Sequence, residues 1–384
     1  MSVSERNMSE RYLSALRALE RDNRLRSLAP RDGIDFASND YLALANAPRM
    51  KQAVIAAIEA GTPIGAGGSR LLRGNCEEHE QVEAEAARFF GAEAALFFSS
   101  GYIANFAVLT ALPQRGDLIV LDDLVHASIR EGAKASRAET AEVAHNDAAA
   151  FEAAIRQWRE SGGKGRAWLV VESIYSMDGD FAPLADLLAI ARRHDAFVVV
   201  DEAHATGVYG ESGRGLTAAY GHADNIVVVH TCGKALGAVG ALVTCTKVLR
   251  EFIINRCRPF IFATAPSPLM AVAVLEALRI LQEEPERQQR LQDLIAFTNR
   301  EIGARNSWRS SGSQILPYIV GNNARTMTLA AALQKRGFDI RGIRPPTVPA
   351  GTARLRISLT LNVDEAKVRA MLDALAEEAA RLDA

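Results

Sequence analysis

The 384-residue sequence has few cysteines and no excess of charge of either sign. Cys76, Cys232, Cys245 and Cys257 form no C-x-x-C pair and no spacing typical of a metal site. We therefore expect free thiols in a reducing compartment and no bound metal. Lysine and arginine number 44 against 46 aspartates and glutamates, a net charge of −2. This balance gives no reason to expect a nucleic-acid or membrane partner.

The sequence also lacks a long apolar run. Its first 22 residues, MSVSERNMSERYLSALRALERD, are charged throughout and contain no apolar signal-peptide core. The longest apolar helical stretch, at residues 268–281, is too short and too interrupted to cross a bilayer. We therefore expect a cytoplasmic protein.

Five short apolar runs dominate the first two thirds of the chain. Each is continuous rather than alternating, which is typical of strands covered on both faces in a mostly parallel sheet. Alanine-rich helical stretches at 76–90, 148–160 and 183–194 lie between them. This alternation predicts an α/β doubly wound domain that binds its ligand beyond the carboxyl ends of the strands. The runs are 94–98, 118–121, 167–171, 196–200 and 225–229.

The remaining segments predict a smaller C-terminal α+β domain and an N-terminal arm. We expect an amphipathic helix at 8–28 and a strand at 34–37, then a long helical region at 266–305 and two strands flanking a helix. The flanking strands are 315–320 and 353–359, and the helix is 325–336. The predicted parts are therefore an N-terminal helix and arm (1–47), a large α/β domain (48–285) and a C-terminal α+β domain (286–384).

Asp201-Glu202-Ala203-His204 directly follows one predicted strand. An aspartate there could hold magnesium in a nucleotide hydrolase, pair with a protonated cofactor nitrogen, or cap the next helix. The hydrolase needs a G-x-x-x-x-G-K-[ST] loop. Gly233-Lys234 is followed by Ala235 with no glycine five residues earlier, and the glycines at 65–68 follow no buried strand, so they are not a dinucleotide-binding fingerprint either. The nucleotide-hydrolase alternative is therefore disfavoured.

Lys234 follows the next predicted strand, 33 residues after Asp201. A lysine at such a strand end is often just solvated. One strand–helix–strand step from an aspartate, however, it fits a different pattern. A lysine Schiff base with an aspartate on the pyridinium nitrogen is the protein signature of pyridoxal phosphate.

Two further strand ends carry suitable groups. Ser100-Gly101-Tyr102 follows the strand at 94–98 and opens a helix, whose first amides could hold a phosphate. His126 follows the strand at 118–121 and could stack on a flat ring, although a helix cap or a core histidine is equally compatible with this position. Taken together, the Ser/Gly turn, His126, Asp201 and Lys234 predict one cofactor site.

With these motifs, the sequence resembles the α-oxoamine synthases, fold-type I pyridoxal-phosphate enzymes that condense an amino acid with an acyl thioester and release carbon dioxide. The resemblance covers nearly the whole chain. It runs through Phe36-Ala37-Ser38-Asn39-Asp40-Tyr41-Leu42, Gly67-Gly68-Ser69-Arg70, Ser100-Gly101-Tyr102, Ser176-Met177-Asp178-Gly179-Asp180, Asp201-Glu202-Ala203-His204-Ala205-Thr206-Gly207 and Thr231-Cys232-Gly233-Lys234.

The resemblance implies roles for individual residues. Lys234 would carry the cofactor, Asp201 would pair with its ring nitrogen, and His126 would stack on the ring and act in catalysis. His204 would contact the ring hydroxyl. Further cofactor contacts would come from Ser100, Gly101, Tyr102, Ser176 and Thr231, and from Thr264 of a neighbouring subunit in a homodimer with composite sites.

The loop Ile343-Arg344-Pro345-Pro346-Thr347-Val348-Pro349 and the following Arg354-Leu355-Arg356 resemble the biotin-pathway branch of the family most. This implies condensation of L-alanine with a pimeloyl thioester, carried on coenzyme A or on an acyl carrier protein. Arg26 or Arg24 and Thr347 would meet the acyl substrate, Arg356 the amino-acid carboxylate, and Asn39 and His126 the substrates. The alternatives are the glycine-using synthases of the family, or a non-catalytic protein that keeps the fold.

Overall fold

The computed structural model describes residues 3–221, 223–305 and 308–383. They form two compact units. The larger contains Asn39–Ser176 and Asp180–Gln292, and the smaller contains Met1–Ser38, Met177–Gly179 and Asp293–Ala384. A short excursion of the chain at Met177–Gly179 thus belongs to the smaller unit, although the segments on either side belong to the larger one.

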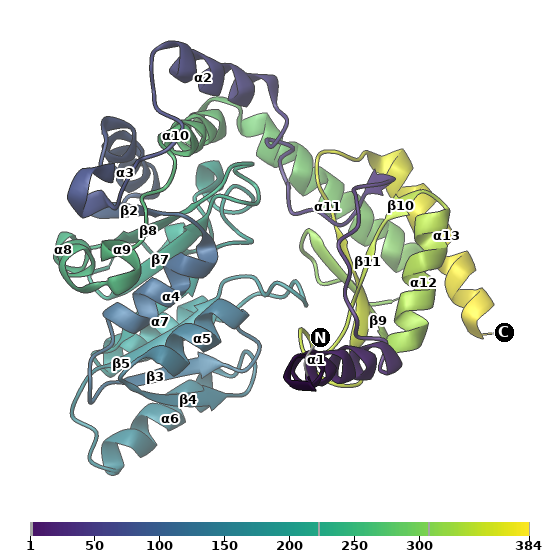
Figure 1. Cartoon of the computed structure of the whole chain (residues 1–384), viewed down its shortest axis with the longest axis horizontal. Coiled ribbons are helices and arrows are strands. Elements are labelled where there is room, and N and C mark those ends of the chain that lie inside the picture. The colour runs from purple at the N-terminus through teal and green to yellow at the C-terminus, as the bar shows by residue number, and fades with distance from the viewer. Residues whose placement is uncertain (1–2, 222, 306–307, 384) are drawn as a thin grey trace. The chain divides into compact units, whose positions relative to one another are not determined.

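A seven-stranded sheet in the order β2-β8-β7-β6-β5-β3-β4 forms the centre of the larger unit (Figure 1). All neighbouring strands are parallel except β8, which runs antiparallel to both β2 and β7. The strands are β2 (Ala94–Phe98), β3 (Leu118–Asp122), β4 (Glu139–Val143), β5 (Ala167–Glu172), β6 (Phe197–Asp201), β7 (Ile226–Thr231) and β8 (Ala241–Cys245). The predicted mostly parallel sheet is therefore confirmed.

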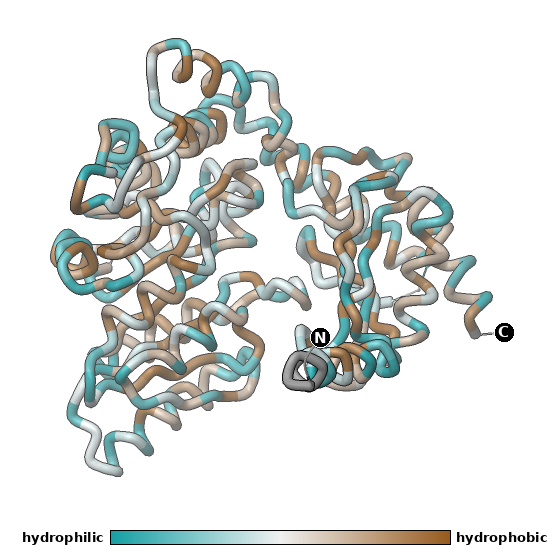
Figure 2. The backbone as a smooth tube through the Cα atoms, in the orientation of Figure 1, coloured by the Kyte–Doolittle hydropathy of each residue, from teal (hydrophilic) through white to brown (hydrophobic). Residues whose placement is uncertain are grey.

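Two hydrophobic clusters cover the two faces of this sheet. Ile119 and Leu121 of β3 lie in one cluster with residues of α4, α5 and α9, while Leu118 and Val120 lie in the other with residues of α6 and α7. Burial on both faces explains why the strands are continuous apolar runs, visible as brown tubes in Figure 2.

The helices of the larger unit include those that connect its strands. They are α2 (Pro48–Glu59), α3 (Glu77–Phe90), α4 (Gly101–Ala111), α5 (Ala127–Ala135), α6 (Ala148–Glu160), α7 (Leu184–Arg193), α8 (Lys247–Arg256), α9 (Arg258–Ile261) and α10 (Pro268–Glu283). Short single-turn helices are η1 (Arg70–Gly74), η2 (Glu211–Gly213) and η3 (Thr217–Tyr220). The predicted helical region at 266–305 is two helices, because α11 (Pro285–Arg305) begins anew at a proline.

The smaller unit is α+β, as predicted. Its antiparallel sheet has the order β11-β12-β9, and a two-stranded parallel sheet joins β1 to β10. The elements are α1 (Val3–Arg21), β1 (Ile34–Asp35), β9 (Ile315–Gly321), α12 (Asn323–Lys335), β10 (Phe338–Asp339), β11 (Arg341–Ile343), β12 (Ala353–Ser358) and α13 (Glu365–Asp383). The predicted helix at 8–28 is wrong at its end: α1 stops at Arg21, and Asn23 takes a left-handed conformation with φ of 55°.

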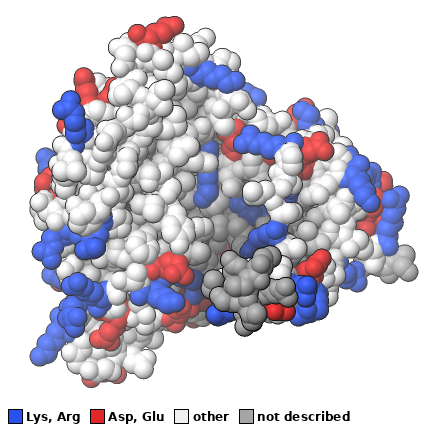
Figure 3. All heavy atoms as spheres, in the orientation of Figure 1, with Lys and Arg blue, Asp and Glu red and all other residues white. Residues whose placement is uncertain are grey.

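On the face shown in Figure 3, positive and negative side chains are interspersed, in keeping with the balanced composition. Within the described residues, no helix has the length and apolar character that a membrane span requires.

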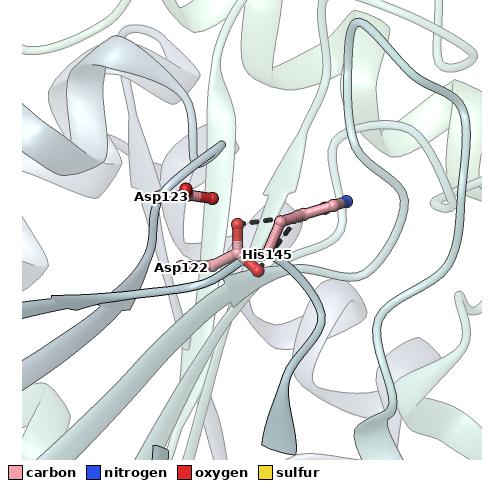
Figure 4. Close-up of side chains that lie close together, drawn as sticks. All are labelled: Asp122, Asp123 and His145. Atoms are coloured by element: carbon pink, nitrogen blue, oxygen red, sulfur yellow. Dashed lines mark hydrogen bonds and ion pairs between the residues drawn. The ribbon is translucent and has the colours of Figure 1, made fainter. Parts of the chain in front are cut away.

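His145 forms ion pairs with two aspartates and so connects the end of β3 to the loop before α7. Nδ1 of His145 lies 2.9 Å from Asp122 at the end of β3, and Nε2 lies 2.7 Å from Asp180. Asp122, Asp123 and His145 lie close enough to suggest a metal site (Figure 4). Because both ring nitrogens of His145 already meet carboxylates, we interpret the group as an ion-paired bridge. Burial alone would lower the pKa of His145, but the two carboxylates raise it to about 10.

This bridge predicts a pH-dependent contribution to stability. The folded pKa of His145 lies above its unfolded value of 6.5, so its contribution is complete below pH 6.5 and disappears as the pH rises through about 10. We expect His145→Gln to lower the free energy of unfolding by about 1–3 kcal/mol at pH 6.5, between the values for exposed and buried pairs. Urea denaturation at pH 6.5, 8.5 and 10 measures this; an equal loss at all three values would contradict it.

Candidate active site

The parallel direction of β2, β3, β5, β6 and β7 brings their carboxyl ends to one edge of the sheet. The segments that follow these strands contain most of the predicted cofactor residues. They are Ser100-Gly101-Tyr102 after β2, His126 after β3, Ser176 after β5, His204 after β6 and Lys234 after β7, with Asp201 and Thr231 as the last residues of β6 and β7.

Asp201 is 4% exposed and is held from two directions. The Asn105 side-chain amide donates to Oδ2 at 2.6 Å, and the Ala203 backbone amide donates to Oδ1 at 2.8 Å. Two short donors stabilise a carboxylate in the ionised form inside a protein. These two hydrogen bonds fix the position of the Asp201 carboxyl group at the strand end.

A hydrogen-bonded chain leads from Asp201 to His126. Asn105 of α4 also donates to Ser128 Oγ at 3.0 Å, and that hydroxyl lies 2.8 Å from Nδ1 of His126. Burial lowers the pKa of His126, Lys234 lowers it further, and Asp201 opposes both. His126 is therefore a neutral imidazole whose ring orientation is fixed through Ser128.

His204 is oriented by a second chain. Its Nδ1 lies 2.6 Å from the Tyr41 hydroxyl, and that hydroxyl donates to Oδ1 of Asn39 at 3.0 Å. His204 is 2% exposed and Tyr41 is fully buried. The predicted substrate residue Asn39 is therefore linked to the predicted cofactor residue His204 through a phenol within the larger unit.

Gly101 starts α4 where the chain passes close to the end of β7. A Cβ atom added to Gly101 would lie 2.4 Å from the Thr231 hydroxyl oxygen, so a side chain here would displace Thr231. Ser100 caps the helix by accepting from the Ile103 amide at 3.2 Å. The first amides of a helix have no acceptor within the helix, so this turn provides donors for an anion.

Lys234, Tyr102, Ser176 and Thr264 differ in their surroundings. Lys234 is half-buried and close enough to affect the pKa of both His126 and Glu172. Tyr102 is 45% exposed and presents its ring edge-on to His126, with the centroids 6.5 Å apart. The amide of buried Ser176 donates to Glu172, while Thr264 is exposed.

Three residues of this edge had no predicted role. Asn105 and Ser128 connect Asp201 to His126, and Glu172 ends β5 directly beside Asp201 in the strand register. Asn105 follows Gly101 by one helical turn, a spacing that only becomes informative once the neighbouring strand end is known. Glu172 ends an apolar run, as Asp201 does, and this position at a strand end could have indicated it as a site residue from the sequence alone.

These residues fit pyridoxal phosphate. The absence of a side chain at Gly101 lets the start of α4 lie against Thr231 at the end of β7, and the first helix amides suit a phosphate. Asp201 provides a buried carboxylate for a protonated ring nitrogen, His126 provides a neutral ring, and Lys234 provides an amine. The donors and acceptors thus match the three parts of the cofactor: phosphate, ring and aldehyde.

The predicted residues of the smaller unit form their own group. Arg26 donates to Thr347 Oγ1 at 3.1 Å, while Arg24 donates to the carbonyl oxygen of Pro345 at 3.0 Å. Arg344 donates to the carbonyl oxygen of Asn23 at 2.8 Å, and burial and Arg26 lower its pKa. Both candidate N-terminal arginines therefore contact the 345–347 loop, but only Arg26 contacts a side chain there.

The two arginines of β12 are both buried, at 3% for Arg354 and 7% for Arg356, so neither belongs to a surface ion pair. Arg354 pairs with Asp178 and also donates to Thr352. Arg356 donates to Ser358 Oγ at 2.7 Å. The carboxylate partner of Arg354 comes from the Ser176–Asp180 motif, which explains the excursion of Met177–Gly179 into this unit.

Comparison with known proteins identifies the family of this chain. Residues 31–375 match the family model described as aminotransferase class I and II. The chain is 41% identical over 347 residues to an 8-amino-7-oxononanoate synthase of Chromobacterium violaceum, covering 89% of this chain and 88% of that protein. It is 43% identical over 344 residues to that of Burkholderia thailandensis, covering 87% and 86%.

Solved structures are also similar. An 8-amino-7-oxononanoate synthase from Francisella tularensis has a TM-score of 0.76 at 30% identity, covering 91% of this chain and 98% of that one. A serine palmitoyltransferase from Sphingomonas wittichii has a TM-score of 0.85 at 27% identity, covering 92% and 88%. A high-resolution structure of SPT with a PLP internal aldimine has a TM-score of 0.86 at 29% identity, covering 92% and 89%.

The family model spans most of the chain, the curated relatives match nearly all of it, and the strand-end residues fit the cofactor. The chain therefore belongs to the aminotransferase class I and II family of pyridoxal-phosphate enzymes and, within it, to the α-oxoamine synthases.

Proposed function

We propose that this protein is a pyridoxal-phosphate-dependent acyltransferase of biotin biosynthesis. It condenses L-alanine with a pimeloyl thioester to give 8-amino-7-oxononanoate, carbon dioxide and the free thiol. One observation carries the proposal: a chain 41% identical to an 8-amino-7-oxononanoate synthase over 89% of its length has Asp201 at the end of β6, and His126 and Lys234 after β3 and β7 of the same sheet.

Pyridoxal phosphate, when bound, supplies an electron sink for a carbanion at the amino-acid α-carbon. Lys234 would hold it covalently, Asp201 would pair with its ring nitrogen, and His204 would contact its ring hydroxyl. His126 would cover one face of the ring. The phosphate and the remaining ring contacts would fall to Ser100, Gly101, Tyr102, Ser176 and Thr231, and to Thr264 of a partner subunit.

Lys234 also moves the proton that the reaction requires. With the cofactor and the amino acid bound, its Nζ would act as the general base that removes the α-proton and would return a proton to the same carbon. A neutral His126 nearby adds no positive charge that would oppose protonation of this amine. The fixed orientation of His126 through Ser128 and Asn105 keeps the stacking surface in place.

Arg356 is the proposed partner of the alanine carboxylate. Arg356 is buried on β12, and the planar fork of a guanidinium matches a carboxylate with two hydrogen bonds. Arg354, two residues away on β12, pairs with Asp178 of the Ser176–Asp180 motif and donates to Thr352.

Arg26 is the proposed N-terminal contact for the acyl substrate, together with Thr347. The hydrogen bond between them supports Arg26 over Arg24, which contacts only the backbone of the same loop. Pro345 and Pro346 restrict the backbone of this loop and so limit the positions of Thr347. The acyl group would arrive on coenzyme A or on an acyl carrier protein, with Asn39 as a further substrate contact.

Serine palmitoyltransferase is the second candidate, because such structures have TM-scores of 0.85 and 0.86 against this chain. Their identity is 27–29%, however, whereas the curated 8-amino-7-oxononanoate synthases reach 41–43%. Backbone similarity is shared across the family, and substrate choice lies in side chains. Sequence identity is therefore the better guide here.

We predict that alanine with a pimeloyl thioester gives the fastest carbon dioxide release when alanine, glycine and serine are crossed with pimeloyl, acetyl, succinyl and palmitoyl thioesters. One methyl group is worth only ~1–3 kcal/mol in an apolar pocket, so slower turnover of glycine is compatible with this result. Lys234→Ala should release no carbon dioxide above the blank, while the exposed Lys51→Ala keeps full activity. A preference for serine with palmitoyl, or glycine with acetyl or succinyl, would refute the assignment.

We predict that two arginine variants separate the two substrates kinetically. Arg356→Ala should raise the KM for alanine about 10- to 100-fold, as expected for loss of a charged hydrogen bond, with little change in the KM for the thioester. Arg26→Ala should do the reverse by about tenfold. The exposed Arg31→Ala is the control. If either variant raised both KM values equally, its assigned substrate contact would be wrong.

We propose a homodimer, and the surface around α9 supports it. Phe262 is 70% exposed beside a groove of about 850 Å³ that Phe106, Phe252 and Ile261 also line. Arg137, Arg256 and Arg258 line the same groove, and exposed apolar side chains rimmed by polar groups are typical of interaction sites. We predict that Phe262→Asp yields an inactive monomer in sedimentation velocity, whereas Val248→Asp, at a position 78% exposed on α8, remains an active dimer. A fully active wild-type monomer would contradict the proposal.

A further inference from the structure

Glu172 is a second buried acid at the active-site edge, beside the acid that the cofactor needs. It ends β5 and pairs in register with Asp201, which ends β6. Adjacent strands are about 4.8 Å apart, so the two backbones are immediate neighbours. Glu172 is 2% exposed and Asp201 is 4% exposed. Two carboxyl groups therefore share a site that water barely reaches.

The two acids are supported very differently. Asp201 receives hydrogen bonds from Asn105 at 2.6 Å and Ala203 at 2.8 Å. Glu172 accepts a longer bond at Oε2, from the Ser176 amide at 3.2 Å, and the His126 amide also favours its charged form. Its Oε1 is buried and has no hydrogen-bond partner among the described residues. An ionised carboxylate is an acceptor with about four lone-pair positions, so Glu172 lacks what a buried charge requires.

Glu202, in contrast to Glu172, is a buried glutamate with several hydrogen-bond donors around it. It accepts hydrogen bonds from the Thr217 amide at 2.6 Å, the Ser173 hydroxyl at 2.9 Å and the Leu216 amide at 3.2 Å. No comparable set surrounds Glu172 in the described part of the chain. Of these two buried glutamates, Glu172 is thus the one with an oxygen that has no hydrogen-bond donor among the described residues, and it is the one that lies next to Asp201.

Groups on several neighbouring elements affect the pKa of Glu172. Burial raises the pKa of Glu172 most, to about 8, and Asp201 on β6 raises it as well. Lys234, after β7, and the amides of His126 and Ser176 act in the opposite direction without reversing the result. Tyr175 and His126 are both uncharged at neutral pH. Like charges on adjacent carboxyls disfavour double ionisation.

We propose that Glu172 is a neutral carboxylic acid that donates a hydrogen bond through Oε1 to the bound cofactor–substrate group, leaving Asp201 as the one carboxylate that charges the site. This inference rests on the proposed cofactor but concerns a residue outside the set that the family resemblance supplied. Glu172 acts as a positioning residue: it orients what Lys234 carries without adding a second negative charge beside it.

The charge part of the proposal is tested with the reconstituted holoenzyme by titrating its visible absorbance band between pH 5 and 10. Glu172→Gln keeps the shape and a donor but cannot ionise. If Glu172 is neutral, the midpoint of the titration stays within about 0.3 pH units of the wild type. A downward shift of about one unit or more would show that an ionised glutamate had been removed and would overturn the proposal. Asp201→Asn is the comparison in which such a shift is expected.

The hydrogen-bond part is tested by the dissociation constant of pyridoxal phosphate. Glu172→Met has similar size and no donor, so its dissociation constant should rise about tenfold, whereas that of Glu172→Gln should stay within about threefold of wild type. Equal values for Gln and Met would mean that no hydrogen bond is made. A wild-type protein that forms no visible band at all would instead refute the proposed cofactor chemistry.

Stability of the holoenzyme against pH gives a readout that does not depend on activity. The folded pKa of Glu172 lies above its unfolded value of 4.5, so the wild type loses stability relative to Glu172→Gln as the pH rises from 4.5 to about 8. The difference in Tm should therefore grow in favour of the Gln variant between pH 5 and pH 8. A difference that is constant over this range would contradict a neutral Glu172.

Discussion

The common direction of five strands is the constraint on which the site depends. Because β2, β3, β5, β6 and β7 run parallel, each delivers the residue after its last apolar position to the same edge. Residues as distant in sequence as Gly101 and Thr231 come close enough that an added Cβ atom would clash. The chemistry of the site thus follows from strand direction before any individual side-chain contact is considered.

Much of this arrangement was predictable, because strands buried on both faces have a local sequence signature. The apolar runs gave β2, β3, β5, β6 and β7 to within a residue or two, and the fold class, the family and the cofactor are confirmed. β4 escaped prediction because Glu-Thr-Ala-Glu-Val is mostly exposed and has no apolar run. The reversed direction of β8 depends on its partners β2 and β7, which no local pattern encodes.

The same limit applies to the site. Asp201, His204 and Lys234 were predicted because they follow apolar runs, whereas Asn105 and Ser128 make their contacts with partners on other elements. The choice between Arg24 and Arg26 depends on their contacts with a loop 321 residues further along the chain. What sequence reasoning misses here is the pairing of polar groups across elements, since each such group looks ordinary in its own segment.

The exposed strand β4 has a consequence for how this protein behaves while it folds. It forms one edge of the seven-stranded sheet, pairs with β3 alone among the described strands, and presents Glu139 and Glu142 to solvent. Another chain that added a strand there would have to bring its backbone beside these charges and remove their water. Sheet-to-sheet growth is therefore penalised in partly folded molecules, and the edge acts as a barrier to aggregation.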